Sequence, residues 1–293
     1  MRNRKARMAA VAGALALATG LVAPAHAVAP APVTVAETAL DAPVLYGRAA
    51  YMLDASTGKT LLDDHGGERM PIASLTKTMT AYLVLKLAKP TDVVEISRAD
   101  VAYAEDGGGT TADLRAGDRL TVGELLYGLM LPSGADAAHA LARTYGPGVD
   151  GFVARMNATA RELGMNNTLY VNADGLPSPR GNGYSTARDQ TVLAAEALRN
   201  PLIKQAAGTR YHRLDASAEH GAYSWRNTNR LLGTPGAIGL KTGFTRAAGY
   251  CLAFAGEENG QTLVGVILGE SVSARRFSTA ESLLSWGAAR TAA

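Results

Sequence analysis

Ser74 and Lys77 are the residues of this 293-residue sequence whose types and spacing point most directly to chemistry. They bound the tetrapeptide SLTK at the start of an apolar periodic stretch, and residues three apart on a helix share one face. A serine hydroxyl becomes a nucleophile when a neighbouring base takes its proton. Lysine can be that base once burial and nearby positive charge lower its pKa toward neutrality. Taken alone, such a pair is more often an N-cap serine beside a surface lysine, so other motifs must support it.

Two later motifs offer a second hydroxyl and a second cation. Ser133, in the segment SGA, lies in a turn between two helical patterns, where its simplest role is to cap the next helix. Lys241, in the segment KTG, closes an apolar strand pattern. A cation there can hold a carboxylate, and Gly243 lets a ligand approach the backbone closely. A strand that simply ends in a turn is the commoner explanation, so each motif is weak by itself.

Hydrophobic periodicity supplies the elements that would position these motifs. Helices are predicted at 74–87, 120–131, 135–145, 149–165, 186–199 and 274–289. Strands are predicted at 46–53, 59–62, 238–242, 250–255 and 263–268, with a hairpin turn at 54–58. Strands at both ends of the chain with helices between them predict a mixed α/β fold of the α+β kind. Its antiparallel sheet is flanked by helices and interrupted by an inserted all-helical subdomain.

The N-terminus has the pattern of an export signal. Basic residues at positions 2, 4, 5 and 7 precede an uncharged apolar run at 8–23, and the segment AHA at 25–27 supplies small residues for cleavage. The sequence therefore predicts a signal peptide at 1–27, a disordered Pro- and Ala-rich lead-in at 28–43 and a catalytic domain at 44–293. An uncleaved membrane anchor is the alternative, although the run is short for a spanning helix.

Composition argues against several other classes of protein. The chain has 29 basic and 26 acidic residues, and loss of the basic signal would leave the two nearly balanced, which removes the case for a nucleic-acid partner. A single cysteine, Cys251, excludes an intramolecular disulfide and any cysteine-built metal site, and the five histidines include no close pair at metal-ligand spacing. No metal or cofactor is expected. The segment GGG at 107–109 lacks the Lys-Ser/Thr of a phosphate-binding loop and is interpreted as a plain loop.

The order of the three motifs, S-x-x-K, then S-G-x, then K-T-G, resembles the signature of penicillin-binding proteins and class A β-lactamases. Over roughly 46–286 the chain is similar to the serine-type D-alanyl-D-alanine carboxypeptidases, which are low-molecular-mass penicillin-binding proteins. Further segments that carry the likeness are MTAY at 79–82, YSTARD at 184–189, NTNRLL at 227–232 and GLKTGFT at 239–245. The resemblance implies a fold of the penicillin-binding-protein and β-lactamase type.

The resemblance also implies a role for each motif residue. The implied site comprises the catalytic residues Ser74, Lys77 and Ser133 and the substrate-binding residues Lys241, Thr242, Gly243 and Phe244. Ser74 would attack the carbonyl between two D-alanines while Lys77 takes its proton, and Ser133 would pass a proton to the leaving D-alanine. Lys241 and Thr242 would bind the terminal carboxylate. The backbone N–H groups of Ser74 and Phe244 would hold the oxyanion.

The implied function is an exported serine DD-carboxypeptidase that removes the terminal D-alanine from peptidoglycan stem peptides through an acyl-enzyme, with β-lactams as inhibitors. It would be secreted, or lie in the cell wall or periplasmic space, with no stable membrane anchor and no nucleic acid as partner.

One residue departs from the family pattern, because Ala135 stands where the family usually has asparagine. Asp136 is not expected to replace it, since the next position on a helix points about 100° away.

Two alternative functions stay open on the sequence. A class A-like β-lactamase would need rapid hydrolysis of the acyl-enzyme; Glu162 and Asn166 loosely match the deacylation loop of that class, although a helix end explains them more simply. A catalytically inert penicillin-binding protein is the second alternative, motivated by Ala135. Cys251 lies in an apolar strand pattern and is interpreted as a buried hydrophobe rather than a reactive thiol.

Overall fold

A computed structural model describes residues 41–179, 181–258 and 260–291 of the chain. The predicted signal peptide at 1–27 and most of the predicted lead-in at 28–43 lie outside the described residues, so the division at 27 and 43 stays a prediction. Among the helices that the structure describes, none is long and apolar enough to span a bilayer.

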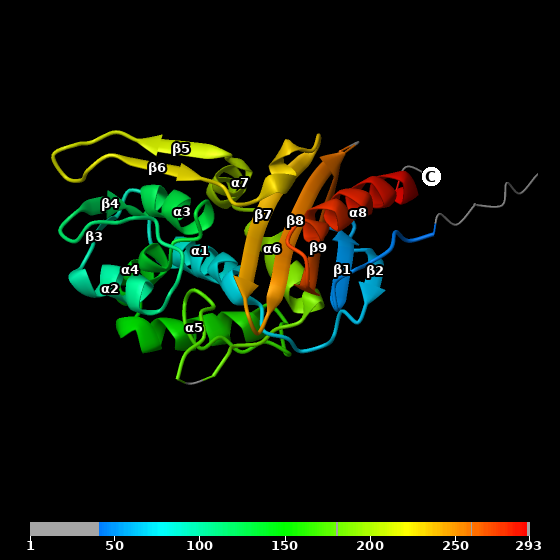
Figure 1. Cartoon of the computed structure of the whole chain (residues 1–293), viewed down its shortest axis with the longest axis horizontal. Coiled ribbons are helices and arrows are strands. Elements are labelled where there is room, and N and C mark those ends of the chain that lie inside the picture. The colour runs from blue at the N-terminus through cyan, green and yellow to red at the C-terminus, as the bar shows by residue number, and fades with distance from the viewer. Residues whose placement is uncertain (1–40, 180, 259, 292–293) are drawn as a thin grey trace, which may run out of the picture. The chain divides into compact units, whose positions relative to one another are not determined.

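The centre of the described structure is a five-stranded antiparallel sheet in the order β2-β1-β9-β8-β7 (Figure 1). Its strands are β1 Ala49–Asp54, β2 Thr60–Asp64, β7 Ala237–Thr245, β8 Gly249–Glu258 and β9 Gln261–Glu270. Strands β8 and β9 each carry an unbroken run of buried residues, as expected of strands covered on both faces. Strand β1 pairs with β9 from Ala49 opposite Leu268 to Asp54 opposite Leu263, so segments from both ends of the chain meet in the sheet.

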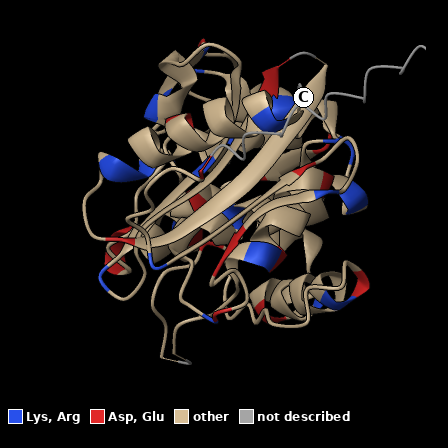
Figure 2. Ribbon diagram, turned by 90° about the vertical axis from the view of Figure 1, so that its right-hand side faces the viewer, with Lys and Arg blue, Asp and Glu red and all other residues tan. Residues whose placement is uncertain are grey.

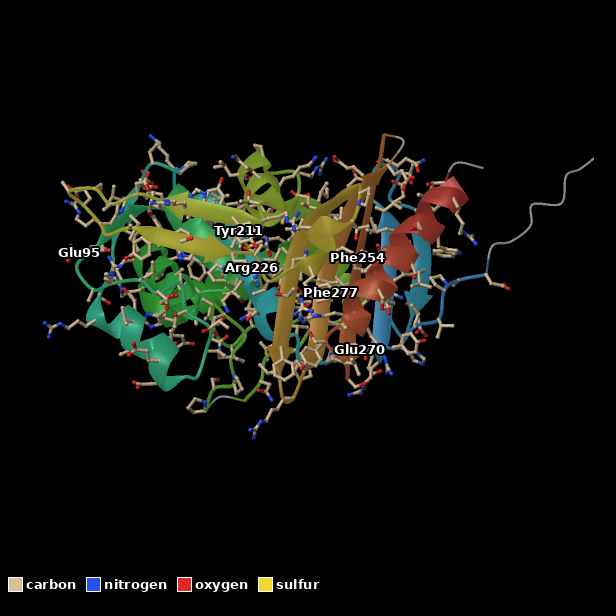
Figure 3. The ribbon with its side chains drawn as sticks, turned by 45° about the horizontal axis from the view of Figure 1, so that its top comes forward. Glu95, Tyr211, Arg226, Phe254, Glu270 and Phe277 are labelled. Carbon is tan, nitrogen blue, oxygen red and sulfur yellow. The ribbon has the colours of Figure 1, made fainter. Side chains whose placement is uncertain are left out.

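Helices cover both faces of this sheet (Figures 1 and 2). One face carries the C-terminal helix α8, Arg275–Thr291, and its Phe277 and the strand residue Phe254 belong to the same apolar cluster (Figure 3). The other face carries α6, Ala187–Ala197, against which α1, Thr76–Leu87, packs. The buried residues of these two helices belong to a second and larger cluster. The sheet therefore separates two apolar cores.

Further helices and two short ribbons lie between β2 and β7 along the chain. The helices are α2 Arg98–Asp106, α3 Val122–Met130, α4 Ala135–Tyr145, α5 Gly148–Glu162 and α7 Pro201–Gly208. The ribbons pair β3 Val93–Glu95 with β4 Arg119–Thr121, and β5 Tyr211–Leu214 with β6 Tyr223–Arg226. The 3-10 turns are η1 Ala73–Leu75 and η2 Arg230–Gly233. Capping boxes begin α2, with Ser97 and Asp100, and α3, with Thr121 and Glu124.

The expected fold class is confirmed, because an antiparallel sheet is flanked by helices and interrupted by a largely helical insertion. The predicted elements correspond to β1, β2, β7, β8 and β9 and to α1, α3, α4, α5, α6 and α8, with shifted ends. The insertion differs from the all-helical expectation in its two ribbons. Their strands have only three or four residues each, too few to show an alternating pattern in the sequence.

Candidate active site

Ser74 and Lys77 lie side by side at the start of α1. Ser74 belongs to the 3-10 turn η1 that leads into the helix, and Lys77 follows one turn later, as the S-x-x-K spacing predicts. The Lys77 Nζ donates hydrogen bonds to Ser74 Oγ at 3.0 Å and to the backbone oxygen of Asp174 at 2.9 Å. Lys77 is only 1% exposed. The commoner interpretation, an N-cap serine beside a surface lysine, therefore does not fit this pair.

The backbone before Ser74 turns sharply. Ala73 has a φ of 49°, in the left-handed region that non-glycine residues seldom adopt. Gly175, with a φ of 82°, lets the loop after α5 press on this turn, since a Cβ at that position would lie 1.9 Å from the Ala73 oxygen. This close approach brings the backbone oxygen of Asp174 onto Lys77. The loop thus holds the amine in place beside the hydroxyl.

The surroundings of Lys77 give its amine the character of a base. Burial lowers the pKa of Lys77 from 10.5 to about 8, while the carboxylates of Asp174 and Asp136 act in the opposite direction. At neutral pH, about one tenth of the amines with that pKa are uncharged. For an exposed lysine the uncharged fraction is below about one in a thousand. An uncharged amine in contact with a serine hydroxyl is what activation of the serine requires.

Ser133 forms the turn between α3 and α4 and lines the same cavity as Ser74 and Lys77. Its backbone has a φ of 70°, and the turn is fixed because the Ser133 oxygen accepts a hydrogen bond from Thr110 Oγ1 at 2.7 Å. The Ser133 Oγ is buried and has no hydrogen-bond partner within the described part of the chain. Buried hydroxyls are normally paired, so this one is available to a bound molecule.

Neither Ala135 nor Asp136 lines the cavity. The Asp136 carboxylate accepts the backbone N–H groups of Ala112 at 2.9 Å and Leu114 at 3.1 Å, so it does not replace the family asparagine, as expected. Ala135 is fully buried, and a Cβ added at Gly109 would lie 3.0 Å from the Ala135 Cβ. The glycine segment, interpreted from sequence as a plain loop, therefore closes over position 135 and forms part of the cavity wall.

Strand β7 brings the K-T-G motif to the cavity along one edge of the sheet. Thr242, Gly243 and Phe244 all line the cavity. A Cβ at Gly243 would lie 3.0 Å from the Ile72 oxygen and 3.2 Å from the Ser74 nitrogen. Glycine at this position therefore lets the strand approach the serine closely.

Lys241 stands beside the cavity rather than in its lining. It is 1% exposed, and its Nζ donates a hydrogen bond to the backbone oxygen of Thr242 at 3.1 Å. Burial, together with the nearby charges of Lys77 and Arg276, lowers the pKa of Lys241. The resemblance implies that Lys241 and Thr242 bind the terminal carboxylate. In the structure Thr242 lines the cavity, and Lys241 lies buried next to it in the strand.

The cavity has a volume of about 270 Å³ and collects residues from distant parts of the chain. Its lining residues are Ser74, Lys77, Gly108, Gly109, Thr110, Pro132, Ser133, Leu176, Thr228, Thr242, Gly243, Phe244 and Arg276. A larger cavity of about 490 Å³ lies between the β1–β2 hairpin and α6, and it contains none of the motif residues. The candidate active site is therefore the smaller cavity.

Comparison with known proteins agrees with this geometry. The model of the peptidase S11 family, described as D-alanyl-D-alanine carboxypeptidase, matches residues 36–272. The chain belongs to this family. The enzyme is 37% identical to the D-alanyl-D-alanine carboxypeptidase of Streptomyces sp. (strain K15), over 85% of its own length and 90% of the relative's. It is 33% identical to D-alanyl-D-alanine carboxypeptidase DacC of Escherichia coli (strain K12), over 86% of its own length and 64% of that longer chain.

Solved structures give the same result. The enzyme superposes on the crystal structure of the Streptomyces K15 DD-transpeptidase with a TM-score of 0.81 and 35% identity, covering 85% of the enzyme and 100% of that chain. It superposes on a D-alanyl-D-alanine carboxypeptidase from Mycobacterium tuberculosis H37Rv with a TM-score of 0.80 and 30% identity, covering 86% and 95%. The resemblance inferred from the motifs is confirmed, and with it the enzyme class, a serine-type D-Ala-D-Ala carboxypeptidase and hence a hydrolase.

Thr228 and Arg276 are among the lining residues of the enzyme's cavity to which no role is assigned from the sequence. Thr228, inside the NTNRLL segment, places its Oγ1 2.6 Å from Thr242 Oγ1. Arg276, in the first turn of α8, donates from Nη1 to the backbone oxygens of Gly243 at 2.8 Å and Cys251 at 3.1 Å. The available signal for Arg276 was its place on the apolar side of the last helix, where an arginine needs a buried partner.

Glu162 and Cys251, which were not assigned to the site, lie outside this cavity. Glu162 is the last residue of α5 and its carboxylate lies 3.8 Å from Lys86 Nζ at the surface, which confirms the helix-end interpretation. Cys251 is buried in β8, where burial raises its pKa to about 11, which confirms its interpretation as a buried hydrophobe. Within residues 41–291, masked positions apart, no three His, Cys, Asp or Glu side chains group in a way that could hold a metal ion.

Proposed function

We propose that this enzyme is an exported serine DD-carboxypeptidase that removes the terminal D-alanine from peptidoglycan stem peptides through an acyl-enzyme on Ser74. The strongest support is the 3.0 Å hydrogen bond from Lys77 Nζ to Ser74 Oγ, inside a cavity that Ser133 and Thr242 also line. One cavity thus offers a nucleophile, its base, an unpartnered hydroxyl and a hydroxyl for a carboxylate.

In the acylation step, uncharged Lys77 takes the Ser74 proton as Oγ attacks the carbonyl carbon between the two D-alanines. The carbonyl oxygen becomes an oxyanion, which the backbone N–H groups of Ser74 and Phe244 hold; such donors contribute about 3 kcal/mol each. The absence of a side chain at Gly243 supports this arrangement, because it lets β7 lie against the Ser74 backbone.

Collapse of the tetrahedral intermediate breaks the C–N bond and leaves the acyl group as an ester on Ser74. The departing nitrogen takes the proton that Lys77 had accepted, and the free hydroxyl of Ser133 passes it on. Water then attacks the ester, Lys77 accepts its proton, and Ser74 is restored with release of the shortened peptide. A β-lactam follows the same first step, but its amine stays tethered to the acyl group and the acyl-enzyme persists.

The end of the cavity near Thr242 suits the terminal carboxylate of the substrate. Thr242 offers its hydroxyl there, and its bond to Thr228 keeps that hydroxyl oriented. Arg276 lines the same cavity, and the buried Lys241 lies next to Thr242 in the strand. We assign the direct contact to Thr242 and the favourable charge to the arginine and the lysine.

Export rests on the N-terminal sequence and on the family's peptidoglycan substrate. Cleavage after Ala27 would leave Val28 as the first residue. The intact mass of the protein recovered from outside the cytoplasm tests this proposal. A mass that includes residues 1–27 would favour the uncleaved anchor instead.

Ser74→Ala tests the proposed nucleophile. Covalent labelling by a fluorescent penicillin and release of D-alanine from diacetyl-Lys-D-Ala-D-Ala should both vanish, because the attacking oxygen is gone. The thermal unfolding midpoint should stay close to that of the native enzyme. Ser224→Ala, which removes an exposed hydroxyl on β6 outside the cavity, is the matched control and should retain both activities.

The same assays separate the alternatives. Labelling that survives in Ser74→Ala would refute the assignment of the nucleophile. Labelling of the native protein without D-alanine release would identify an inert penicillin-binding protein. Steady hydrolysis of nitrocefin, with no persistent acyl-enzyme in the mass spectrum, would identify a β-lactamase.

A further inference from the structure

Phe244 places an exposed phenyl ring at the mouth of the active-site cavity. Its residue is 52% exposed, although phenylalanine is a residue type that folded chains usually bury. Its ring stacks on Tyr250 of β8, with centroids 4.4 Å apart and ring planes 27° from parallel. The guanidinium carbon of Arg276 lies 5.1 Å from the centroid of the Tyr250 ring. Phe244 and Tyr250 together form what we call the aromatic platform.

The aromatic platform is held firmly from behind. Arg276 is fixed by its hydrogen bonds to the backbone oxygens of Gly243 and Cys251, at 2.8 and 3.1 Å. Tyr250 lies directly opposite Phe244 in the pairing of β7 with β8. Cross-strand aromatic pairs of this kind add to the stability of the strand pairing. A rigid apolar surface next to a reactive serine is suited to binding rather than to folding alone.

The direction of the substrate along β7 follows from the proposed function, on which this inference rests. The terminal carboxylate is assigned to Thr242, and the scissile carbonyl to Ser74 and the backbone N–H of Phe244. The path from carboxylate to carbonyl therefore runs along the strand from residue 242 to residue 244. Thr242 and Phe244 are two apart, so their side chains share one face of the strand, and both line the cavity. The acyl group continues from the carbonyl past the Phe244 ring.

We propose that the aromatic platform is a subsite for the acyl group on the amino-terminal side of the scissile bond, and that it selects acyl groups with an aromatic or extended aliphatic surface. An apolar group laid on Phe244 removes exposed aromatic surface from water on both sides of the contact. Leu176, from the loop after α5, adds a second apolar side chain to the cavity lining. An acyl group that ends in a methyl is too short to cover the platform and gains little from it.

Phe244→Ser tests the subsite with two penicillins that differ only in their acyl group. Benzylpenicillin carries a phenylacetyl group and 6-acetamidopenicillanic acid an acetyl group on the same bicyclic nucleus. In the native enzyme we expect the second-order acylation rate constant to be about tenfold larger for benzylpenicillin, the usual scale for one buried apolar group. The ratio should fall to near one in Phe244→Ser. Because both compounds use the same Ser74 and oxyanion site, changes in the backbone cancel in the ratio.

Two further variants serve as an intermediate case and as a control for the ratio of the two rate constants. Phe244→Leu keeps an apolar surface and should retain part of the preference. Tyr211→Ser removes another exposed aromatic side chain, 62% exposed on β5 and outside the cavity (Figure 3), and should leave the ratio unchanged. An equal ratio in the native enzyme and Phe244→Ser would overturn the subsite while leaving the proposed function intact. Failure of the native enzyme to react with either penicillin would instead overturn the proposed function.

Discussion

The charge on Lys77 is set by the groups that face it. They include the carboxylates of Asp174, from the loop after α5, and Asp136, from α4; Lys241 of β7 is also near, and burial and the charge of Lys77 lower the pKa of Lys241. Burial lowers the pKa of Lys77 to about 8, and the two carboxylates limit this fall. The base form therefore becomes dominant above that pH. For the native enzyme, the rate of penicillin labelling should rise about tenfold from pH 7 to pH 9 as the uncharged fraction grows.

Asp174→Asn should move this pH profile toward lower pH. The substitution removes a negative charge that favours the ammonium form, so the pKa of Lys77 falls and labelling at pH 7 rises relative to labelling at pH 9. Asparagine keeps the side-chain oxygen that accepts the Leu176 N–H at 2.9 Å, and the backbone oxygen that contacts Lys77 is unaffected.

The control for this prediction is Asp215→Asn, which removes an exposed carboxylate paired with Arg213. Second-order labelling rates measured from pH 6 to pH 10 should show no displacement in the control. A displacement of the Asp174→Asn profile to higher pH, or one of the same size in both variants, would contradict the assignment of Lys77 as the base.

Short-range spacing explains which site residues the sequence could reveal. Ser74 and Lys77 are one helical turn apart, so their contact follows from the local pattern alone. Asp174 contacts Lys77, and Arg276 lines the cavity, only through tertiary packing. The close approach at Gly175 positions Asp174, and the packing of α8 on the sheet positions Arg276. Neither kind of packing leaves a local pattern, which is why both residues were missed.

At the scale of elements, one buried carboxylate attaches α2 to α4. Asp100 is fully buried; it lies 2.7 Å from His139 Nδ1 and accepts a hydrogen bond from Arg143 Nη2 at 2.8 Å. Burial opposes the charge on Asp100, but the hydrogen bonds from His139, Arg143 and Ser97 outweigh it and hold the pKa of Asp100 well below its usual range. The link matters to the site because Gly108 and Gly109, which follow α2 closely, line the cavity.

Asp100→Ala should lower the free energy of unfolding by about 3 kcal/mol at pH 7, because it leaves His139 and Arg143 without their buried partner. The value lies at the low end for buried pairs, since the Arg143 side chain is 36% exposed and partly screened by solvent. Because the folded state lowers the pKa of Asp100, this stability is present above the unfolded-state value of about 3.9 and is lost as the pH falls below it.

Urea unfolding at several pH values measures this contribution. The difference between the native enzyme and Asp100→Ala should narrow as the pH falls from about 4 toward 2. Asp106→Ala, at the exposed end of the same helix, should change the unfolding free energy by less than about 0.5 kcal/mol. A difference that stays constant between pH 7 and pH 2 would show that the charge of Asp100 is not what stabilises the fold.

Helix α7 shows why some elements escape prediction. The helix predicted at 186–199 ends just before the dipeptide Asn200-Pro201, and no further helix is predicted after it. In the structure the side-chain oxygen of Asn200 accepts hydrogen bonds from the N–H groups of Leu202 and Ile203, and Pro201 occupies the first turn. The same dipeptide therefore begins α7.

The β5–β6 ribbon is held by a contact with a distant part of the chain, the hydrogen bond from Trp225 Nε1 to the Ala112 oxygen at 2.8 Å. The local sequence pattern around the ribbon does not reveal this contact.

For the whole molecule, the sheet places the α8 core and the larger helical core on opposite faces. Leu283 of α8 is fully buried in the smaller core, where Met52 and Phe254 of the sheet belong to the same cluster. Leu283→Ala should lower the free energy of unfolding by about 3 kcal/mol, from lost burial and the cavity left behind. Urea unfolding measures this loss, and Ser282→Ala, exposed on the same helix, is the matched control.

Labelling distinguishes a loss of stability from a loss of site geometry in this variant. Below its unfolding transition, Leu283→Ala should still bind one penicillin per chain, because Leu283 does not line the cavity. A folded Leu283→Ala protein that fails to label would show instead that the packing of α8, which carries Arg276, controls the geometry of the site.

The antiparallel architecture could be predicted because the apolar runs of β7, β8 and β9 follow one another with only short Gly-containing turns between them. The strand order could not, since the pairing of β1 with β9 joins residues more than about two hundred positions apart, and the sequence holds no local record of it.

The pairing of β1 with β9 determines when the sheet can fold during translation. The middle strand of the sheet, β9, consists of residues 261–270. Its neighbour β1 consists of residues 49–54 and leaves the ribosome much earlier. The early strand must wait for nearly the entire polypeptide before it finds its partner, and a prematurely terminated product lacks the middle of the sheet altogether. We therefore expect the complete sheet, and the site along its β7 edge, to form only after residue 270 has left the ribosome.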